Sequence, residues 1–300
     1  MAYIEIDTLT KDYGNKNGIF DISLSVEQGE IFGFAGINGA GKTTTIRHLM
    51  GFLNPDSGTS TIQGLDCWAQ SAKVKQKISY IPGEIAFPDD GTGETFLKRQ
   101  IELNNRGSME YCKELCDKFQ LDATANLKSM SKGMKQKTAI ILAFMLDSDI
   151  IIMDEPTTGL DPLMRDVFLE LVLEEKKKGK TIFMSTHIFE EIEAVCDRVA
   201  LIKDGKIKSI KNIDEIRYNK NKTYRIEFKN SDSYINFLNL NYKLDYSEEQ
   251  KNQVQVQIHD SNIKSLMNDL KNLDVLFFKE IKSTLEDYFK EVFKEEMVND

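Results

Sequence analysis

Hydrophobic residues recur along the chain with two different periods, and these periods predict where strands and helices lie. The short apolar runs "DIIIMDEP" and "KTIFMSTH", which begin at Asp149 and Lys180, are typical of buried parallel strands. Residues 3–6 and 22–26 predict strands of a β-rich edge. Between residues 93 and 146, apolar residues recur at spacings of three and four and predict helices. We therefore expect an α/β fold.

The composition shifts after residue 212 toward asparagine, lysine and aromatic residues. The segments "TYRIEFK" and "QVQVQIH" alternate strictly and predict half-buried strands. The segments "NIKSLMNDLKNL" and "STLEDYFKEVFKEE" carry apolar stripes at helical spacing. The pattern therefore predicts a main domain at residues 1–212 and a small accessory α/β domain at residues 213–300.

Charge and hydropathy narrow the range of partners. The chain has 39 Lys and Arg against 48 Asp and Glu, a net charge of −9, which argues against a dedicated nucleic-acid binder. The longest uncharged apolar stretch, residues 138–146, is about half of the roughly 20 residues that cross a bilayer. The N-terminus predicts a strand and no signal peptide. We expect a soluble protein whose membrane role comes through a partner.

The four cysteines form no CxxC pair and no zinc-binding pattern with histidine. One helical turn separates Cys112 from Cys116, which is compatible with a metal site, but the sequence offers no second pair of ligands. Reduced thiols on helices are the favoured interpretation, and they suit the cytosol.

A glycine-rich loop is the first segment that indicates chemistry. "GINGAGKTT" follows an apolar strand, precedes a helix and fits the pattern G-x-x-x-x-G-K-[ST]. Its backbone N–H groups would surround phosphate oxygens, and the helix N-terminus adds positive potential. Lys42 is expected to reach the β- and γ-phosphates and to act in catalysis, while Thr43 binds Mg²⁺ and Thr44 contacts the α-phosphate. The nucleotide-binding residues predicted here are Gly36, Ile37, Asn38, Gly39, Ala40, Gly41, Lys42, Thr43 and Thr44.

Two adjacent acids are candidates for the metal ligand and the general base, which a phosphate loop does not itself provide. Asp154 and Glu155 end the strand of "IIIMDEP", and open parallel sheets bind ligands at that edge. Asp154 is placed to hold Mg²⁺, and Glu155 is placed to polarise the attacking water as a general base. Together with the loop, these acids predict a nucleoside triphosphatase.

A third segment resembles a known family. "MSKGM", from Met130 to Met134, resembles the LSGGQ signature of the ATP-binding subunits of ABC transporters, and it matches at Ser131 and Gly133. It lies about twenty residues before Asp154, where the family places it. The resemblance covers roughly residues 1–212. It implies a P-loop ATPase core of mixed sheet with an antiparallel β edge and a helical subdomain at about residues 86–147.

The resemblance also implies how the site is completed. Two copies, or two closely related subunits, face head to tail, and each ATP lies between one glycine loop and the partner's Ser131 and Gly133. Three further positions match the family. Asp161 ends the loop that crosses the dimer interface, His187 is the switch histidine that contacts the γ-phosphate, and Tyr13 stacks on adenine.

One position departs from the family pattern. Gly83 stands where the family has a glutamine after the strand of "ISYIPGEIAF". Glycine has no side chain for the metal, so either the neighbouring Glu84 serves after a register shift or the ligand is absent. How metal binding is coupled to the partner therefore stays open.

The function that follows is an ATPase subunit, with ATP and Mg²⁺, that powers a membrane permease encoded on a separate chain. It would sit at the cytoplasmic face of the membrane through that permease. The signature variant, the missing glutamine and the C-terminal segment "STLEDYFKEVF", which is similar to the closing helix of drug- and bacteriocin-exporter subunits, favour export. The alternatives are a non-transport ATPase acting on ribosomes or DNA, and a regulatory nucleotide switch.

Overall fold

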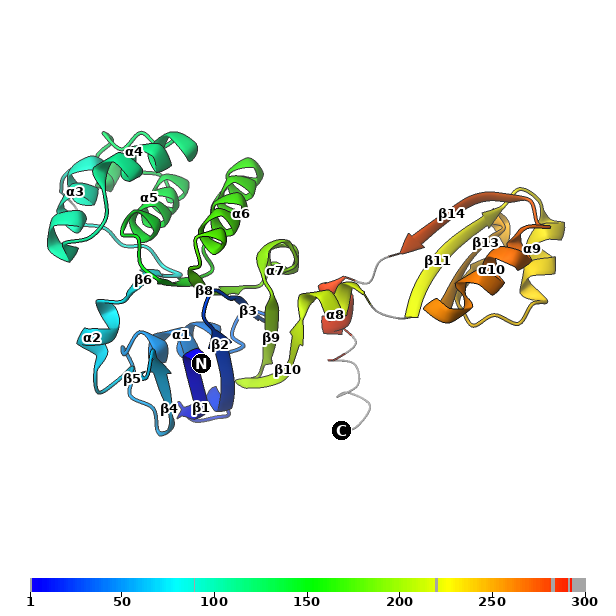
Figure 1. Cartoon of the computed structure of the whole chain (residues 1–300), viewed down its shortest axis with the longest axis horizontal. Helices are drawn as coiled ribbons and strands as arrows, with labels where there is room; N and C mark the ends of the chain where they lie inside the picture. The colour runs from blue at the N-terminus through cyan, green and yellow to red at the C-terminus, as the bar shows by residue number, and fades with distance from the viewer. Residues whose placement is uncertain (1, 89, 219–220, 282–283, 291, 293–300) are drawn as a thin grey trace. The chain divides into compact units, whose positions relative to one another are not determined.

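The computed structural model describes residues 2–88, 90–218, 221–281, 284–290 and 292. The chain forms two compact units, Met1–Asn212 and Ile213–Asp300, which are drawn in Figure 1. Within the described ranges, no helix is both long and apolar enough to cross a membrane.

A six-stranded mixed sheet forms the centre of the first unit. Its strands stand in the order β10-β9-β3-β8-β7-β6 and all pair in parallel, except that β10 is antiparallel to β9. Their bounds are β3 Ile31–Ala35, β6 Ile78–Ile81, β7 Ile150–Asp154, β8 Thr181–Thr186, β9 Arg198–Lys203 and β10 Lys206–Asn212. β3, β7 and β8 are buried at every position, because elements cover both faces of the sheet.

A second, antiparallel sheet with the order β2-β1-β4-β5 forms the edge of this unit. Its strands are β1 Ala2–Asp12, β2 Gly18–Glu27, β4 Ser57–Ile62 and β5 Leu65–Asp66. One apolar cluster joins Ile6 and Leu24 of this sheet to Ile46 of helix α1 (Lys42–Leu49) and to Phe34 and Ile152 of the central sheet. The predicted α/β core with an antiparallel edge is confirmed.

Helices α3, α4 and α5 follow β6 and precede β7. They span Gly93–Asn104, Met109–Lys118 and Lys132–Met145, and a short 3₁₀ turn at Leu127–Ser129 precedes α5. Local capping fixes where these helices start, since Thr92 and Ser108 accept hydrogen bonds from backbone N–H groups of the first turns of α3 and α4. Two further helices, α6 (Pro162–Lys177) and α7 (Phe189–Val195), follow β7 and β8.

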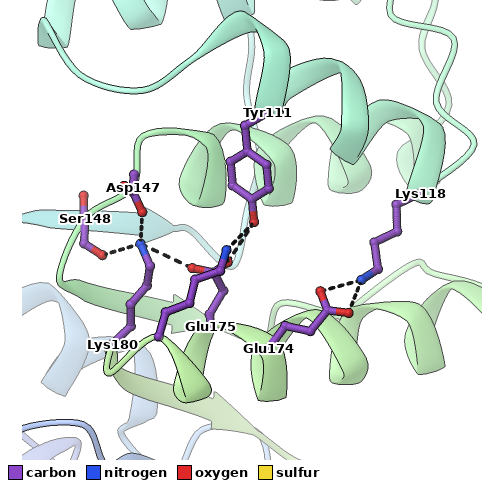
Figure 2. A network of polar contacts seen from close by, with 8 residues as sticks. Tyr111, Lys118, Asp147, Ser148, Glu174, Glu175 and Lys180 are labelled. Atoms are coloured by element: carbon purple, nitrogen blue, oxygen red, sulfur yellow. Dashed lines mark hydrogen bonds and ion pairs between the residues drawn. The ribbon is translucent and has the colours of Figure 1, made fainter.

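A polar network joins α4 to α6 and to the ends of the neighbouring elements (Figure 2). The Tyr111 hydroxyl of α4 donates to the fully buried Glu175 of α6 over 2.7 Å. Lys180 pairs with Asp147 and lies 3.3 Å from Glu175, and it also donates to the Ser148 carbonyl over 3.1 Å. Burial, and then the bond to Glu175, raise the pKa of Tyr111, so its hydroxyl stays protonated and can donate.

The second unit contains a four-stranded antiparallel sheet with helices α9 and α10 in its connections. Its strands are β11 Asn221–Phe228, β12 Leu244–Glu248, β13 Gln253–His259 and β14 Val275–Ile281, in the order β12-β13-β11-β14. Helix α9 (Ser231–Leu238) follows β11, and α10 (Ile263–Leu270) follows β13, so the chain order is β-α-β-β-α-β. This order is that of the split βαβ, ferredoxin-like arrangement. Phe228, Phe237 and Leu266 belong to its separate apolar core.

Two short helical segments flank this sheet in the sequence. Helix α8 spans Ile213–Arg217, and residues 285–290 are helical with Leu285 fully buried. The closing helix predicted from "STLEDYFKEVFKEE" covers residues 283–296, of which 283, 291 and 293–296 lie outside the described ranges.

We expect Tyr111→Phe to lower the free energy of unfolding by about 1–2 kcal/mol, because Glu175 stays buried and loses its hydroxyl donor. Urea unfolding of the full chain measures this. The matched control is Lys118→Met, which breaks the more exposed α4–α6 pair with Glu174 and is expected to cost no more than about 0.5 kcal/mol. Equal losses in the two variants would contradict the importance of the buried network.

Candidate active site

The glycine loop lies between β3 and α1, as its sequence predicts. Gly39 and Gly41 have φ angles of 82° and 110°, a region that residues with a Cβ rarely adopt. The side chain of Lys42 folds back over the loop, and its Nζ donates to the carbonyl oxygens of Gly36 and Ile37 over 2.6 and 3.2 Å. The ammonium group is thus held against the loop backbone, and Lys42 as a whole is 5% exposed.

The two acids at the end of β7 lie beside this lysine. Asp154 is fully buried, and its Oδ1 accepts a 2.6 Å hydrogen bond from the Ser185 hydroxyl of β8. Glu155 takes a left-handed backbone conformation with φ of 50°, which is uncommon for a residue with a side chain. Its Oε1 lies 3.1 Å from Lys42 Nζ, and its Oε2 lies 2.6 Å from His187 Nδ1. The structure therefore brings together Lys42, Glu155 and His187.

The oxygen atoms of Asp154 and Thr43 are ligands of the kind that a hard divalent cation prefers. Asp154 Oδ2 is buried and has no hydrogen-bond partner among the described residues. Thr43, the first residue after Lys42, contributes a hydroxyl at the start of α1. Mg²⁺ prefers such oxygen ligands, and a positive ion beside Asp154 would offset the cost of burying its charge. The residues present therefore fit the ion.

Gly83 also borders this carboxylate. A Cβ placed on Gly83 would lie 3.1 Å from Asp154 Oδ2 and 3.4 Å from its carboxyl carbon. The position that departs from the family pattern is therefore adjacent to the acid, and its missing side chain leaves Oδ2 open on that side. Glu84 is an exposed residue next to it. Whether Glu84 serves the metal stays a prediction.

The signature segment forms the start of α5. Ser131 is the N-cap, and its hydroxyl accepts a 3.2 Å bond from the Met134 N–H. A Cβ on Gly133 would lie 3.1 Å from the Gly159 carbonyl oxygen, so the helix approaches the loop after Glu155 closely. Glycine at this position keeps the N-terminus of α5 near that loop.

The remaining predicted residues lie at the surface or at a helix start. Tyr13 follows β1 and is 51% exposed, which leaves a face of its ring open to a ligand. Asp161 is the N-cap of α6 and accepts a 3.0 Å bond from the Met164 N–H within its own chain. Their contacts with a nucleotide or a partner stay predictions.

Sequence reasoning missed three residues that position the site. Ser185 holds Asp154, and Gln136 of α5 donates over 2.6 Å to the carbonyl of Pro156, next to Glu155. The buried Glu191 accepts hydrogen bonds from Thr157 and Thr186, which flank Glu155 and His187 in the sequence. Burial raises the pKa of Glu191, and the two hydroxyl donors oppose that rise. Of these three, only Ser185 gave a signal in the sequence, as a polar residue inside the apolar run of β8.

The glycine loop lies at the carboxyl edge of a parallel sheet. Beside it are an aspartate suited to bind a metal ion and a glutamate that contacts a histidine. This combination defines a P-loop nucleoside triphosphatase. The helices between β6 and β7, with a glycine at the start of α5, place it among ATPases of the cassette type.

Comparisons with known proteins agree. The family model "ABC transporter" matches residues 19–158. The ATP-binding protein NatA of Bacillus subtilis (strain 168) is 40% identical over 193 residues, covering 62% of this chain and 78% of NatA. The linearmycin resistance ATP-binding protein LnrL of that strain is 35% identical over 212 residues, covering 69% and 68%. A solved ATP-binding subunit of an ABC transporter is 33% identical, with a TM-score of 0.66 over 72% of this chain and 92% of that one.

The chain therefore belongs to the ATP-binding proteins of ABC transporters. It is an ATP-binding subunit with ATPase activity that serves a transporter. The function predicted from the sequence, an ATP-binding subunit of a transporter, is thereby confirmed. The comparisons favour it over the alternatives of an ATPase acting on ribosomes or DNA and of a regulatory nucleotide switch.

We expect Ser185→Ala to raise the Mg²⁺ concentration that gives half-maximal ATP hydrolysis by several-fold, because Asp154 loses the hydroxyl that orients it. The free energy of unfolding should fall by about 1–3 kcal/mol as well. Ser79→Ala is the matched control, since it removes a buried hydroxyl bond between β6 and Ser148, in the connection before β7, without touching an acid. An unchanged Mg²⁺ dependence in Ser185→Ala would contradict this positioning role.

Proposed function

We propose that this subunit hydrolyses ATP at a site shared between two copies and thereby drives export through a permease on a separate chain. The observation that carries the catalytic part is the position of Glu155 between the Lys42 ammonium and the His187 imidazole. A carboxylate held by a phosphate-binding lysine and a histidine lies where a γ-phosphate and its attacking water would meet.

Nucleotide binding would exchange the partner of Lys42. Its ammonium now contacts Glu155 Oε1, and a triphosphate in the loop would present stronger negative charge to it. Transfer of Lys42 to the β- and γ-phosphates would release Glu155 to accept a proton from water. That water forms the new bond to the γ-phosphorus while the bond to the ADP oxygen breaks. His187, 2.6 Å from Glu155, keeps the carboxylate oriented.

Thr43 and Asp154 would hold Mg²⁺, which neutralises charge on the β- and γ-phosphate oxygens when bound. The unpartnered Oδ2 of buried Asp154 supports this assignment. The backbone N–H groups of residues 36–44 would hold the phosphates, and Tyr13 would stack on adenine. Glu84 replaces the missing glutamine only if a register shift brings it to the metal.

Ser131 and Gly133 would complete the site of a second subunit, either an identical copy or a close relative. The first turn of α5 offers free backbone N–H groups beside a glycine, an arrangement that suits a γ-phosphate. Asp161, at the start of α6, would lie at the same interface. ATP would favour the closed dimer because it makes contacts there that the open state lacks.

The direction of transport is inferred from one relative and from features of this sequence. LnrL is described as a linearmycin resistance protein, which suits removal of a toxic compound. The signature variant, the glycine at position 83 and the accessory domain favour export as well. In this proposal the subunit lies at the cytoplasmic face of the membrane and is held there by its permease, and the helices between β6 and β7 transmit the motion.

We expect Glu155→Gln to bind ATP, to lose turnover by at least about a hundredfold and to accumulate as an ATP-bound dimer. Size-exclusion chromatography with multi-angle light scattering, with and without Mg-ATP, measures the dimer, and phosphate release measures turnover. The matched control is Glu174→Gln, on the exposed side of α6. Near-normal hydrolysis by Glu155→Gln would overturn the catalytic assignment.

A further inference from the structure

A cavity of about 170 Å³ lies beside the C-terminal end of α1, and none of its lining residues belongs to the nucleotide site. The last turn of α1 with the loop after it, β4, and β5 with the residues that follow it border this partly open cavity. Six of its lining residues carry polar groups or aromatic rings: His48, Asn54, Thr59, Ser60, Asp66 and Trp68. An apolar cavity of about 150 Å³ holds one benzene molecule, so this space accepts a ligand of five or six heavy atoms.

His48 supplies the first indication of a ligand. It is 1% exposed and it lines the cavity; the backbone of Leu53 interacts with its ring, but neither ring nitrogen is within full hydrogen-bond geometry of a partner among the described residues. A buried polar group without a partner costs free energy that a bound ligand can recover. Burial is the main reason that the pKa of His48 lies below its ordinary value. The imidazole is therefore neutral near pH 7, and one nitrogen is available to accept a hydrogen bond.

Asp66 and Trp68 define the charge that the ligand would carry. Asp66 accepts hydrogen bonds from the N–H groups of Trp68 and Ala69 through Oδ1 alone. Within the described ranges, Asp66 has no lysine or arginine partner, whereas nearby Lys11 is already paired with Asp56 at 2.6 Å. Trp68 is 48% exposed and offers a ring face at the cavity.

We propose that this cavity binds a small organic cation, of the primary amine or amidine class. A carboxylate and an indole ring attract a cation electrostatically, and the neutral imidazole and the hydroxyls of Thr59 and Ser60 can accept its N–H groups. A cation of this size satisfies His48 and balances Asp66 at once.

The same residues disfavour the other occupants. An anion would meet the Asp66 carboxylate and a neutral imidazole, and would find no lysine or arginine in the lining. A neutral alcohol of equal size would fill the volume without pairing the charge. Water can hydrogen-bond to His48 but gains nothing from the Trp68 ring.

The test uses three four-carbon probes of similar size, n-butylammonium, n-butanol and butyrate, titrated into the full chain at constant ionic strength. Trp68 is the only tryptophan in the sequence, so its fluorescence reports directly on the cavity. We expect a saturable change and a rise in Tm with n-butylammonium, and no saturation with butyrate or n-butanol at equal concentration.

Two variants locate the binding. Asp66→Asn keeps the side-chain shape and should weaken n-butylammonium at least about tenfold. His48→Phe removes the acceptor and should weaken it too. Asp122→Asn, which alters a similar local turn elsewhere, is the matched control and should bind normally. Equal responses to all three probes, absence of saturation with n-butylammonium, or unchanged affinity in Asp66→Asn would overturn the proposal.

Discussion

Negative charge buried at the end of β7 is the constraint on which the site depends. Asp154 is fully buried, and Glu155 follows it directly, so two carboxylates lie next to each other at the end of β7, where little water reaches them. Like charges so close are costly unless cations and hydrogen-bond donors compensate them. Lys42, Ser185 and His187 supply part of that compensation. Asp154 Oδ2 has no hydrogen-bond partner among the described residues, so in the proposed function a bound metal ion and nucleotide would supply the rest of the compensation.

The loop after β7 also contacts α5, whose first turn is expected to contact a second subunit. Gln136 donates to the Pro156 carbonyl directly after the acids, and Gly133 approaches Gly159 in that loop. The Tyr111–Glu175–Lys180 network holds α4 against α6 at the other end of this region (Figure 2). We propose that movement of α5 relative to the central sheet would change the surroundings of Glu155 through these contacts, and that dimer closure would reach the proposed base in this way.

Local sequence order explains which parts of the fold and site were predictable. The glycine loop and the acid pair are contiguous motifs flanked by a strand, so their geometry follows from neighbouring residues. Contacts between distant segments were not predictable from pattern alone. Neither the hydrogen bond from Ser185 to Asp154 nor the ion pair between Lys42 and Glu155 leaves a period or a spacing in the sequence. The accessory unit showed alternating strands and helices, but its β12-β13-β11-β14 order required the pairing itself.

The central claim is that each site needs the phosphate loop of one copy and the signature of another. Two inactive variants test it directly: Lys42→Ala, with an intact signature, and Ser131→Arg combined with Gly133→Asp, with an intact loop. When the two are mixed, half of the dimers pair unlike copies and hold one intact site each, so ATPase activity should recover to about a quarter of the wild-type rate. If the mixture stays as inactive as its components, or if an isolated monomer hydrolyses ATP at full rate, the shared site is contradicted.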